Sequence, residues 1–230
     1  FFKQKDYFKK KNIRATVTTG PTREYIDPVR YISNESSGKQ GYEIALELSR
    51  LGIKTTLISG PTNINYSNEI KVKKITSGKQ MLSEVKKSLP TDIAVCTAAV
   101  SDFRPKFKNK QKLKKKMNFD KIQLEQNPDI LEFLGKNNRH KPKLLVGFSA
   151  ETENVVKNSI EKMQEKHCDI IIANDVSKKD TGFNVDYNEI KIIDKNDNIQ
   201  IVKKSSKKFI ASVVAKKIIN SFLEIKKRLN

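Results

Sequence analysis

Residues 13–52 read IRATVTTGPTREYIDPVRYISNESSGKQGYEIALELSRLG, and this stretch decides the fold. Residues 13–19 are mostly β-branched or apolar and stop at Gly20-Pro21, which predicts a buried strand followed by a turn. A long polar loop follows. From Lys39 onward, apolar residues recur at helical spacing, at Ile44, Ala45, Leu48 and Leu51, and Gly52 can end the helix. The stretch therefore predicts a strand, a loop and a helix, which is half of a parallel crossover unit.

The rest of the chain repeats this order of elements. Strands are expected at 54–59, 93–100, 144–148 and 170–173, and helices at 77–89, 129–134, 153–166 and about 206–229. The segments 189–194 and 199–202 flank the turn-forming residues 196–198, which predicts a hairpin near the C-terminus. Alternating strands and helices predict an α/β fold with a doubly wound, mostly parallel, Rossmann-like sheet.

We expect one domain, over residues 13–230, with residues 1–12 as a tail or as a linker from a removed segment. Residues 104–119 read RPKFKNKQKLKKKMNF and are Lys, Arg, Asn or Gln at eleven of sixteen positions. Such polar side chains are not expected in a hydrophobic core, so we expect the segment to be exposed to solvent. This segment is either a disordered basic loop or a flexible lid that closes over a polyphosphate, against which lysines supply point charges.

The net charge of +20 raises the question of whether the protein binds nucleic acid. Of 46 basic residues only 7 are Arg, and Trp is absent, whereas nucleic-acid readers combine Arg with exposed aromatic rings. A compositional bias toward Lys, Asn and Ile explains most of the excess. A basic nucleic-acid-binding α/β module therefore stays only as the alternative hypothesis, separable from an enzyme by the steep salt dependence of its binding.

The chain shows no apolar run long enough to span a bilayer and no signal sequence, so we expect no membrane association and a soluble, cytoplasmic protein. Cys96 and Cys168 are far apart and lack metal-ligand spacing, which favours buried free thiols in a reducing compartment.

Three strand ends carry residues suited to ligands. The first connection contains neither a dinucleotide fingerprint nor a Walker loop, but Ser36-Ser37-Gly38 precedes a helix, where it serves either as a cap or as an anion site. The second connection ends in Ala98-Ala99-Val100-Ser101-Asp102, and Asp102 could hold a ribose, hold Mg²⁺ or cap a loop. Asn174 and Asp175 equally suit a turn or a ligand contact.

Seven segments, in order, resemble the motifs of bacterial phosphopantothenoylcysteine synthetases over nearly the whole chain after residue 12. They are GPTREYIDPVRYISNESSGKQG (20–41), AAVSDFRP (98–105), KLKKK (112–116), NPDIL (127–131), GFSAETEN (147–154), ANDVS (173–177) and GFNVDYNEI (182–190).

The resemblance implies a ligase that joins 4′-phosphopantothenate to L-cysteine with CTP and Mg²⁺, in coenzyme A biosynthesis. The carboxylate is first converted to an acyl-cytidylate, and the cysteine amine then displaces CMP. Asn34 to Gly38 resemble the CTP-dependent type, and the alternative is an ATP-using version of the same enzyme. No flavin is expected in this chain.

The resemblance also implies roles for particular residues. Asn34 would hold the acyl-cytidylate, and Lys112, or Lys114 if the alignment shifts, would reach the CTP phosphates. Nucleotide contacts are implied for Gly20, Ser37, Gly38, Cys96, Thr97, Ala98, Asp102, Pro128, Asp129, Ile130, Leu131, Phe148, Lys162 and Lys166. Substrate contacts are implied for Arg30, Asn34, Ala98 and Ala99, and a Mg²⁺ contact for Asp102. Without the resemblance, Phe148 reads as a strand end, and Lys162 and Lys166 as solvated helix residues.

Members of the family dimerise and build each site partly from the neighbouring subunit, so a homodimer is implied. Many are fused behind a flavin-dependent phosphopantothenoylcysteine decarboxylase. The chain is therefore expected either to be excised from such a bifunctional protein or to be free-standing.

Overall fold

The computed structural model describes residues 2–114, 121–177 and 186–229. Its centre is an eight-stranded sheet with the order β12-β11-β10-β9-β6-β1-β4-β5. These strands are β1 (Arg14–Thr19), β4 (Lys54–Ser59), β5 (Lys71–Lys74), β6 (Ile93–Cys96), β9 (Leu144–Glu151), β10 (Ile170–Asp175), β11 (Tyr187–Asp194) and β12 (Ile199–Ser206). Strands from β5 to β10 pair in parallel, whereas β11 and β12 form an antiparallel hairpin. The predicted doubly wound sheet with a C-terminal hairpin is confirmed.

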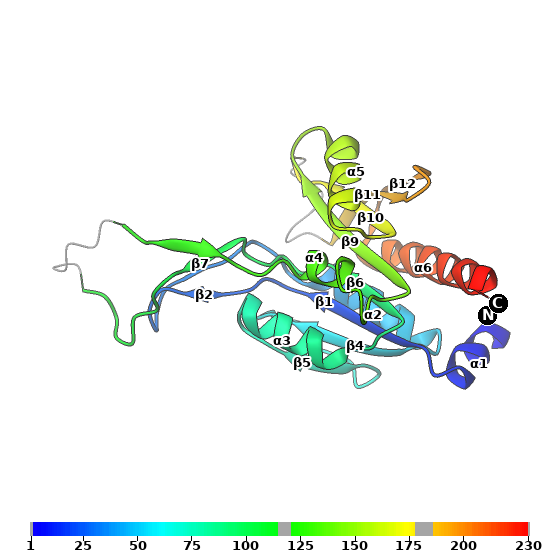
Figure 1. Ribbon diagram of the computed structural model, residues 1–230, viewed down its shortest axis with the longest axis horizontal. Coiled ribbons are helices and arrows are strands. Elements are labelled where there is room, and N and C mark those ends of the chain that lie inside the picture. The colour runs from blue at the N-terminus through cyan, green and yellow to red at the C-terminus, as the bar shows by residue number, and fades with distance from the viewer. Residues whose placement is uncertain (1, 115–120, 178–185, 230) are drawn as a thin grey trace.

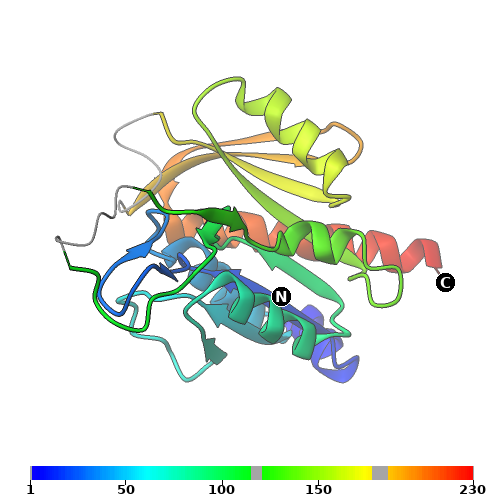
Figure 2. The ribbon, with the colours of Figure 1, turned by 60° about the vertical axis from the view of Figure 1, so that its left-hand side comes forward.

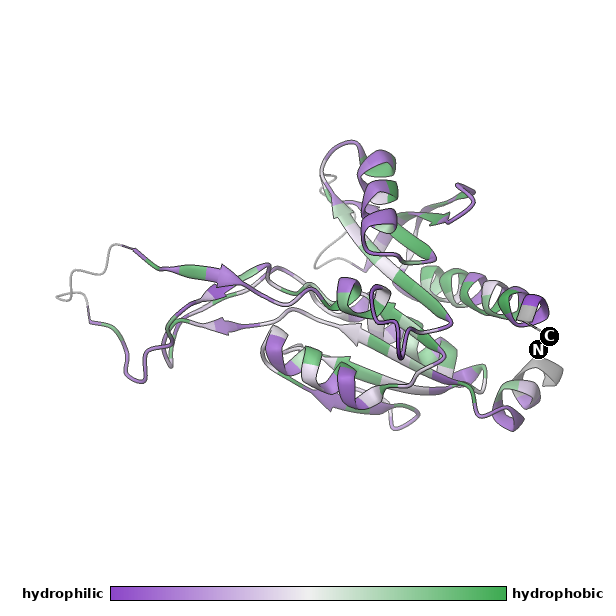
Figure 3. Cartoon of the chain, viewed as in Figure 1, coloured by the Kyte–Doolittle hydropathy of each residue, from purple (hydrophilic) through white to green (hydrophobic). Residues whose placement is uncertain are grey.

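Helices cover both faces of the sheet (Figures 1 and 2). One apolar layer packs beneath α2 (Lys39–Arg50) and α6 (Lys207–Leu229). The other packs beneath α3 (Gly78–Ser88), α4 (Ile130–Gly135) and α5 (Val155–Glu165). The central strand β1 is buried at every position after its first residue, as a parallel strand between two helical layers must be. Apolar residues accordingly gather on the central strands and on the inner sides of the helices (Figure 3).

Local sequence signals set the helix ends. The helix α3 begins after Ser77, whose side chain accepts a hydrogen bond from the Gln80 backbone, while the Gln80 side chain accepts one from the Ser77 backbone. This reciprocal capping box satisfies two of the N–H groups that the first turn leaves free. No helix in the described ranges is long and apolar enough to cross a membrane.

The first residues are not a free tail in this structure. Residues Phe2–Lys10 form helix α1, and the Phe8 side chain is fully buried in the same apolar layer as α6. The Lys226 ammonium near the end of α6 lies 5.9 Å from the centre of the Tyr7 ring. A short helix with two packed aromatic rings buries enough apolar surface to attach, although its sequence is too lysine-rich to show a periodic face. Whether residues 13–230 fold as one separate domain stays a prediction.

Two short antiparallel ribbons project from the body and form an arm (Figure 1). One pairs β2 (Glu24–Tyr25) with β3 (Tyr31–Ile32), and the other pairs β7 (Phe103–Pro105) with β8 (Leu124–Gln126). We call residues 24–32, 103–114 and 121–126 the arm. Strand β2 contacts β7, so the two ribbons lie side by side. Most of the arm is hydrophilic (Figure 3).

The described part of the predicted lid, residues 104–114, is held against the β2–β3 hairpin. The Asn109 backbone donates to the Ile26 carbonyl at 2.9 Å, and the Leu113 backbone donates to the Asp27 carboxylate at 3.2 Å. Residues 115–119 of the predicted lid lie outside the described residues, as do residues 182–185 of the last motif. In this conformation the described segment extends along the arm.

Candidate functional site

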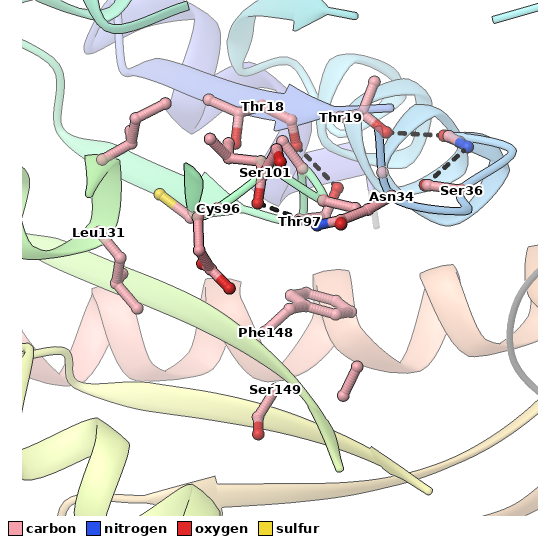
Figure 4. A pocket seen from close by; sticks show the side chains of 18 of the residues that line it. Thr18, Thr19, Asn34, Ser36, Cys96, Thr97, Ser101, Leu131, Phe148 and Ser149 are labelled. Carbon is pink, nitrogen blue, oxygen red and sulfur yellow. Dashed lines mark hydrogen bonds between the residues drawn. The ribbon is translucent and has the colours of Figure 1, made fainter. Parts of the chain in front are cut away.

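A cleft of about 960 Å³ opens at the carboxyl ends of β1, β6, β9 and β10. Its walls come from residues 33–41, 96–103, 126–132 and 148–150, together with Lys162, Lys166, Asn174, Val176, Asn188 and Lys207. Figure 4 shows several of these side chains facing a common space. Because parallel α/β sheets bind ligands at the carboxyl ends of their strands, this cleft is the candidate active site.

The N-terminus of α2 forms one end of the cleft and is open to an anion. Gly38 is the residue just before the helix, with φ of 72°, and its position carries no side-chain capping bond. The Thr19 hydroxyl instead donates to the Gly38 carbonyl at 2.7 Å, and the Ser36 hydroxyl accepts from the Gly38 backbone at 3.3 Å. These bonds shape the turn, and the Lys39 backbone adds only a long hydrogen bond to the Ser37 hydroxyl, at 3.5 Å. Of the two functions that the sequence left open, the geometry favours the anion site.

Glycine also sets how closely α2 approaches the strand ends. A methyl group added at Gly41 would lie 2.1 Å from the Thr97 hydroxyl and 2.4 Å from the Thr19 hydroxyl. Either distance is far too short, so a larger residue would push the helix away from β1 and β6. Gly20, with φ of 75°, lies directly behind Gly38, whose added methyl group would be 3.2 Å from the Gly20 Cα. Gly20 therefore supports the turn and is not itself part of the cleft wall.

Asn34 ties two of the motifs together. Its side-chain amide donates to the Val100 carbonyl at 3.0 Å, joining the loop before α2 to the loop after β6. Ser33 adds a bond from its hydroxyl to the Thr22 carbonyl at 2.8 Å. Asn34 is thus fixed at the cleft wall rather than free on a loop.

The loop after β6 begins with small and uncharged side chains. The Thr97 hydroxyl donates to the Thr18 carbonyl at 2.7 Å, which fixes the loop to β1. Burial raises the pKa of Cys96 to about 12, so this side chain stays a thiol at neutral pH. Cys96 consequently offers apolar lining and is no candidate nucleophile. Both Cys96 and Cys168 are free, as predicted, although Cys96 is only partly buried.

The wall opposite α2 contains a cluster of charges. The Lys166 ammonium lies 2.8 Å from Glu165, 3.2 Å from Glu132 and 3.3 Å from Asp129. The hydrogen bond to Glu165, with the other carboxylates, raises the pKa of Lys166 above its usual range despite partial burial. Asp129 also accepts from the Glu132 backbone at 2.9 Å and so caps α4. The interpretation of Lys166 as a solvated helix residue was wrong, because only 14% of its side chain is exposed.

Most of the residues that the resemblance implied line this cleft. These are Asn34, Ser37, Gly38, Cys96, Thr97, Ala98, Ala99, Asp102, Pro128, Asp129, Ile130, Leu131, Phe148, Lys162 and Lys166. Gly20 supports the wall from behind. Arg30 and Lys112 are the exceptions, because both lie on the arm and do not line the cleft of their own chain.

Arg30 is held by a buried carboxylate. Asp27 is fully buried and bonds the Arg30 guanidinium through two of its nitrogens, at 3.0 and 2.5 Å, while also accepting from the Val29 and Arg30 backbones. The guanidinium holds the pKa of Asp27 well below its usual range. Arg30 then reaches the Leu113 carbonyl at 3.2 Å, directly beside the exposed Lys112. One ion pair therefore positions both predicted cationic residues on the arm.

Several cleft residues were not among the predicted contacts, including Gln40, Asn174, Asn188 and Lys207. Gln40 and Asn188 lie within the matched motifs 20–41 and 182–190 but were given no role, and Lys207 lies outside every matched motif. Asn174 was noted at a strand end as equally suited to a turn or a ligand, and the structure places it in the cleft wall.

The candidate Mg²⁺ contact, Asp102, is an exposed carboxylate in the cleft wall. Within the described ranges, no group of three or more His, Cys, Asp or Glu side chains could hold a metal ion. Mg²⁺ commonly binds through one or two carboxylates together with substrate phosphates. Asp102 fits that pattern of a metal ion delivered with its nucleotide.

Comparisons with known proteins agree with this architecture. A family model described as the DNA/pantothenate metabolism flavoprotein C-terminal domain matches residues 10–222. The chain is 38% identical to the coenzyme A biosynthesis bifunctional protein CoaBC of Haemophilus influenzae, over 93% of this chain and 53% of that protein. It is equally 38% identical to CoaBC of Borreliella burgdorferi, over 94% of this chain and 54% of the relative. The chain thus spans about half the length of these relatives.

A solved structure of the C-terminal domain of CoaBC matches with a TM-score of 0.78 at 34% identity. The match covers 92% of this chain and 96% of the solved one, so the similarity extends over the whole of that domain.

Proposed function

Because the chain belongs to the family of DNA/pantothenate metabolism flavoprotein C-terminal domains, as a phosphopantothenoylcysteine synthetase domain, we propose that it is a phosphopantothenate–cysteine ligase of coenzyme A biosynthesis. We propose CTP as its nucleotide. One observation carries the assignment: a single cleft gathers Asn34, the loop after β6, the start of α4, Phe148 and Lys166, which come from separate motifs.

The first step activates the substrate acid. A free carboxylate cannot expel oxide, so the carboxylate of 4′-phosphopantothenate attacks the α-phosphorus of CTP and displaces pyrophosphate, which gives an acyl-cytidylate. The open N-terminus of α2 offers N–H donors to phosphate oxygens. Mg²⁺, which Asp102 would help to hold, supplies charge neutralisation for the triphosphate when bound.

The second step forms the amide bond. The unprotonated amine of cysteine attacks the acyl carbon, CMP leaves with the electrons of the acyl–phosphate bond, and the nitrogen releases one proton to solvent. Asn34 is the residue suited to polarise the acyl carbonyl, because its amide group is already fixed by Val100 at the cleft wall. A fixed donor needs no reorganisation as negative charge develops on the oxygen.

The choice of CTP rests on the form of residues 34–38, and ATP is the alternative nucleotide. The test is pyrophosphate release by the purified chain with Mg²⁺ and 4′-phosphopantothenate, with CTP or ATP, and with or without cysteine. We expect release that requires phosphopantothenate and is faster with CTP. Faster release with ATP would overturn the nucleotide assignment, and no release with either would overturn the ligase assignment for this chain.

We further propose a homodimer in which the arm of each chain completes the cleft of its partner. Arg30 and Lys112 lie on the arm, outside the cleft of their own chain. The arm also exposes large apolar side chains, namely Val29, Tyr31, Phe103, Phe107, Ile122 and Leu124. Exposed apolar groups concentrated on one projection are typical of a protein interface.

A decarboxylase is the proposed functional neighbour. The CoaBC relatives are named as bifunctional and are about twice as long as the matched region. We propose that the ligase acts in the cytoplasm, fused to or associated with a phosphopantothenoylcysteine decarboxylase that consumes its product.

A further inference from the structure

Lys207 is a buried lysine in the wall of the cleft. It is the first residue of α6, and only 6% of its surface is exposed. The Gln40 side chain donates to the Lys207 carbonyl at 3.2 Å, which ties the start of α6 to the start of α2. Two helix N-termini therefore meet at this part of the cleft, on the sheet face opposite the one that carries Lys162 and Lys166.

No carboxylate in the described part of the chain forms an ion pair with the Lys207 ammonium. Asp186 acts on Lys207 electrostatically, but it is itself paired with the Lys39 ammonium at 2.6 Å. Burial lowers the pKa of Lys207, and the positive charge of Lys39 lowers it further, against the smaller opposing effect of Asp186. A buried ammonium without an ion-pair partner is unfavourable, so a binding anion would remove a cost that the free protein carries.

Lys166 provides the internal comparison. It is also a largely buried lysine of the cleft wall, yet three carboxylates surround its ammonium. The charge of Lys166 is balanced by direct ion pairs, whereas Lys207 forms no ion pair in the described part of the chain and is influenced by Asp186, which Lys39 already engages. An incoming anion therefore gains more from Lys207.

Asn174 gives the independent observation. It is 92% buried, lines the same cleft, and its Oδ1 atom has no hydrogen-bond partner among the described residues. The Oε1 atom of Gln40 is also buried and has no hydrogen-bond partner among the described residues. Buried polar atoms in folded proteins are nearly always hydrogen-bonded, so unpaired atoms that face a cleft point to a ligand. The Asn174 amide can also be placed in the opposite orientation, which presents its N–H donors to an anion.

We propose that Lys207 binds a phosphate oxyanion of a substrate, beside Asn174 and the N-terminus of α2. This inference rests on the proposed function and adds one binding residue to it. The anion is either the polyphosphate of the nucleotide or the 4′-phosphate of phosphopantothenate, which share the same chemistry. Lys207 acts as a point charge toward several oxygens, which suits either group.

The test compares ligand binding by Lys207→Met with that of the unaltered chain, by calorimetry in the presence of Mg²⁺. Inorganic pyrophosphate, CTP and 4′-phosphopantothenate are titrated separately, with cytidine as the ligand that lacks phosphate. We expect Lys207→Met to lose about tenfold or more in affinity for CTP and pyrophosphate, or else for phosphopantothenate, since a charge-assisted hydrogen bond is lost. The ligand that is affected identifies the source of the phosphate. Cytidine binding should not change.

Lys208→Met is the matched control, because Lys208 is the next residue of α6 and is exposed. It should bind all four ligands as the unaltered chain does, and Lys207→Arg should recover most of the lost affinity. Removal of an unbalanced buried charge should leave the melting temperature of Lys207→Met equal or higher, so weak binding would not reflect unfolding. Unchanged affinity for all three phosphates, or an equal loss for cytidine, would overturn the inference. Failure of the unaltered chain to bind any nucleotide would count against the proposed function instead.

Discussion

The cleft and the arm divide between them the residues that one reaction is predicted to need. The cleft is built on buried strand ends, and its residues are fixed by short hydrogen bonds such as that from Thr97 to the Thr18 carbonyl. The arm has ribbons of two or three residue pairs, and the buried carboxylate of Asp27 bonds Arg30 and the Leu113 backbone. Arg30 is therefore fixed by a buried ion pair, on a part of the molecule that projects away from the cleft, and Lys112 is the exposed neighbour of Leu113.

This difference teaches that a set of motifs can be complete in the sequence while the site is incomplete in one folded chain. Residues that are close in the sequence need not belong to the same cleft. Arg30 is four residues from Asn34, yet Asn34 lines the cleft and Arg30 does not. If the proposed dimer is correct, each chain holds two halves of two different sites.

The sharpest test on the cleft side is Asn34→Ala. We expect amide formation to fall on the order of a hundredfold to a thousandfold, because a fixed donor to the developing oxyanion is lost. Pyrophosphate release should fall much less. Product is measured by mass spectrometry and pyrophosphate by a coupled assay, with the exposed Asn65→Ala as control. An equal loss in both steps would contradict the role assigned to Asn34.

Mixing two inactive variants tests whether the arm of one chain completes the cleft of its partner. Arg30→Ala and Asn34→Ala chains are unfolded together and refolded, so that mixed dimers form. If the arm serves its partner, one site of each mixed dimer joins an intact cleft to an intact arm. Activity should then return to about a quarter of the original value, as random pairing in a symmetric dimer predicts.

Arg30→Ala mixed with Lys112→Ala is the control for that experiment. Both variants carry their change on the arm, so no mixed dimer contains an intact site unless the two residues serve different clefts. Recovery in this control would show that Arg30 and Lys112 serve different clefts. No recovery in the first mixture would show that the arm acts on its own chain.

The anchoring of the arm should depend on Asp27. We expect Asp27→Asn to expose the Leu113 amide to hydrogen exchange several-fold faster, since the variant loses the charge that bonds Arg30 and three backbone N–H groups. Exchange of the Val17 amide in the central strand is the internal control. Equal protection of Leu113 in the variant and the unaltered chain would contradict this role.

The pH dependence of the same contact follows from the lowered pKa. A carboxyl whose pKa is lower in the folded state stabilises the fold at pH values above its unfolded pKa, and this contribution is lost as pH falls through the folded value. Leu113 protection should therefore persist at about pH 4, where an ordinary aspartate is half protonated.

The smallest effect is expected for Cys96→Ser. Because burial keeps Cys96 protonated at neutral pH, it performs no nucleophilic step, and activity should stay within about threefold of the unaltered chain. Alkylation of Cys96 at pH 8 should also be far slower than that of a free cysteine, which mass spectrometry can follow. Loss of turnover on substitution would require a direct role for the thiol.

Periodicity and turn residues were sufficient for the long elements of the fold. Strand 54–59 was predicted with its observed bounds, and Ser77 was placed at the start of α3. The short strands β2, β3, β5, β7 and β8 were missed, because two to four residues cannot show an alternating pattern. Helix α1 was missed because its lysines hide the one face that buries Phe8.

For the site, the resemblance supplied the residues, and the structure supplied their grouping. Motifs separated by tens of residues in sequence meet in one cleft because parallel strands end at the same edge of the sheet. The grouping of these motifs was predictable from the fold class. The position of Arg30 and Lys112 outside the cleft was not predictable, because it depends on how the Asp27–Arg30 ion pair orients the β2–β3 hairpin.

The sequence by itself determined the α/β architecture, the buried strands and the motifs, because these depend on residue spacing and local turn chemistry. Only the tertiary structure decided which charges are balanced. Lys166 and Lys207 look alike in the sequence. Their difference arises because α4 and α5 bring three carboxylates to Lys166, whereas Lys207, at the start of α6, makes no ion pair in the described part of the chain and is influenced by both Lys39 and Asp186. Electrostatic balance depends on distances across the fold, which a linear pattern does not contain.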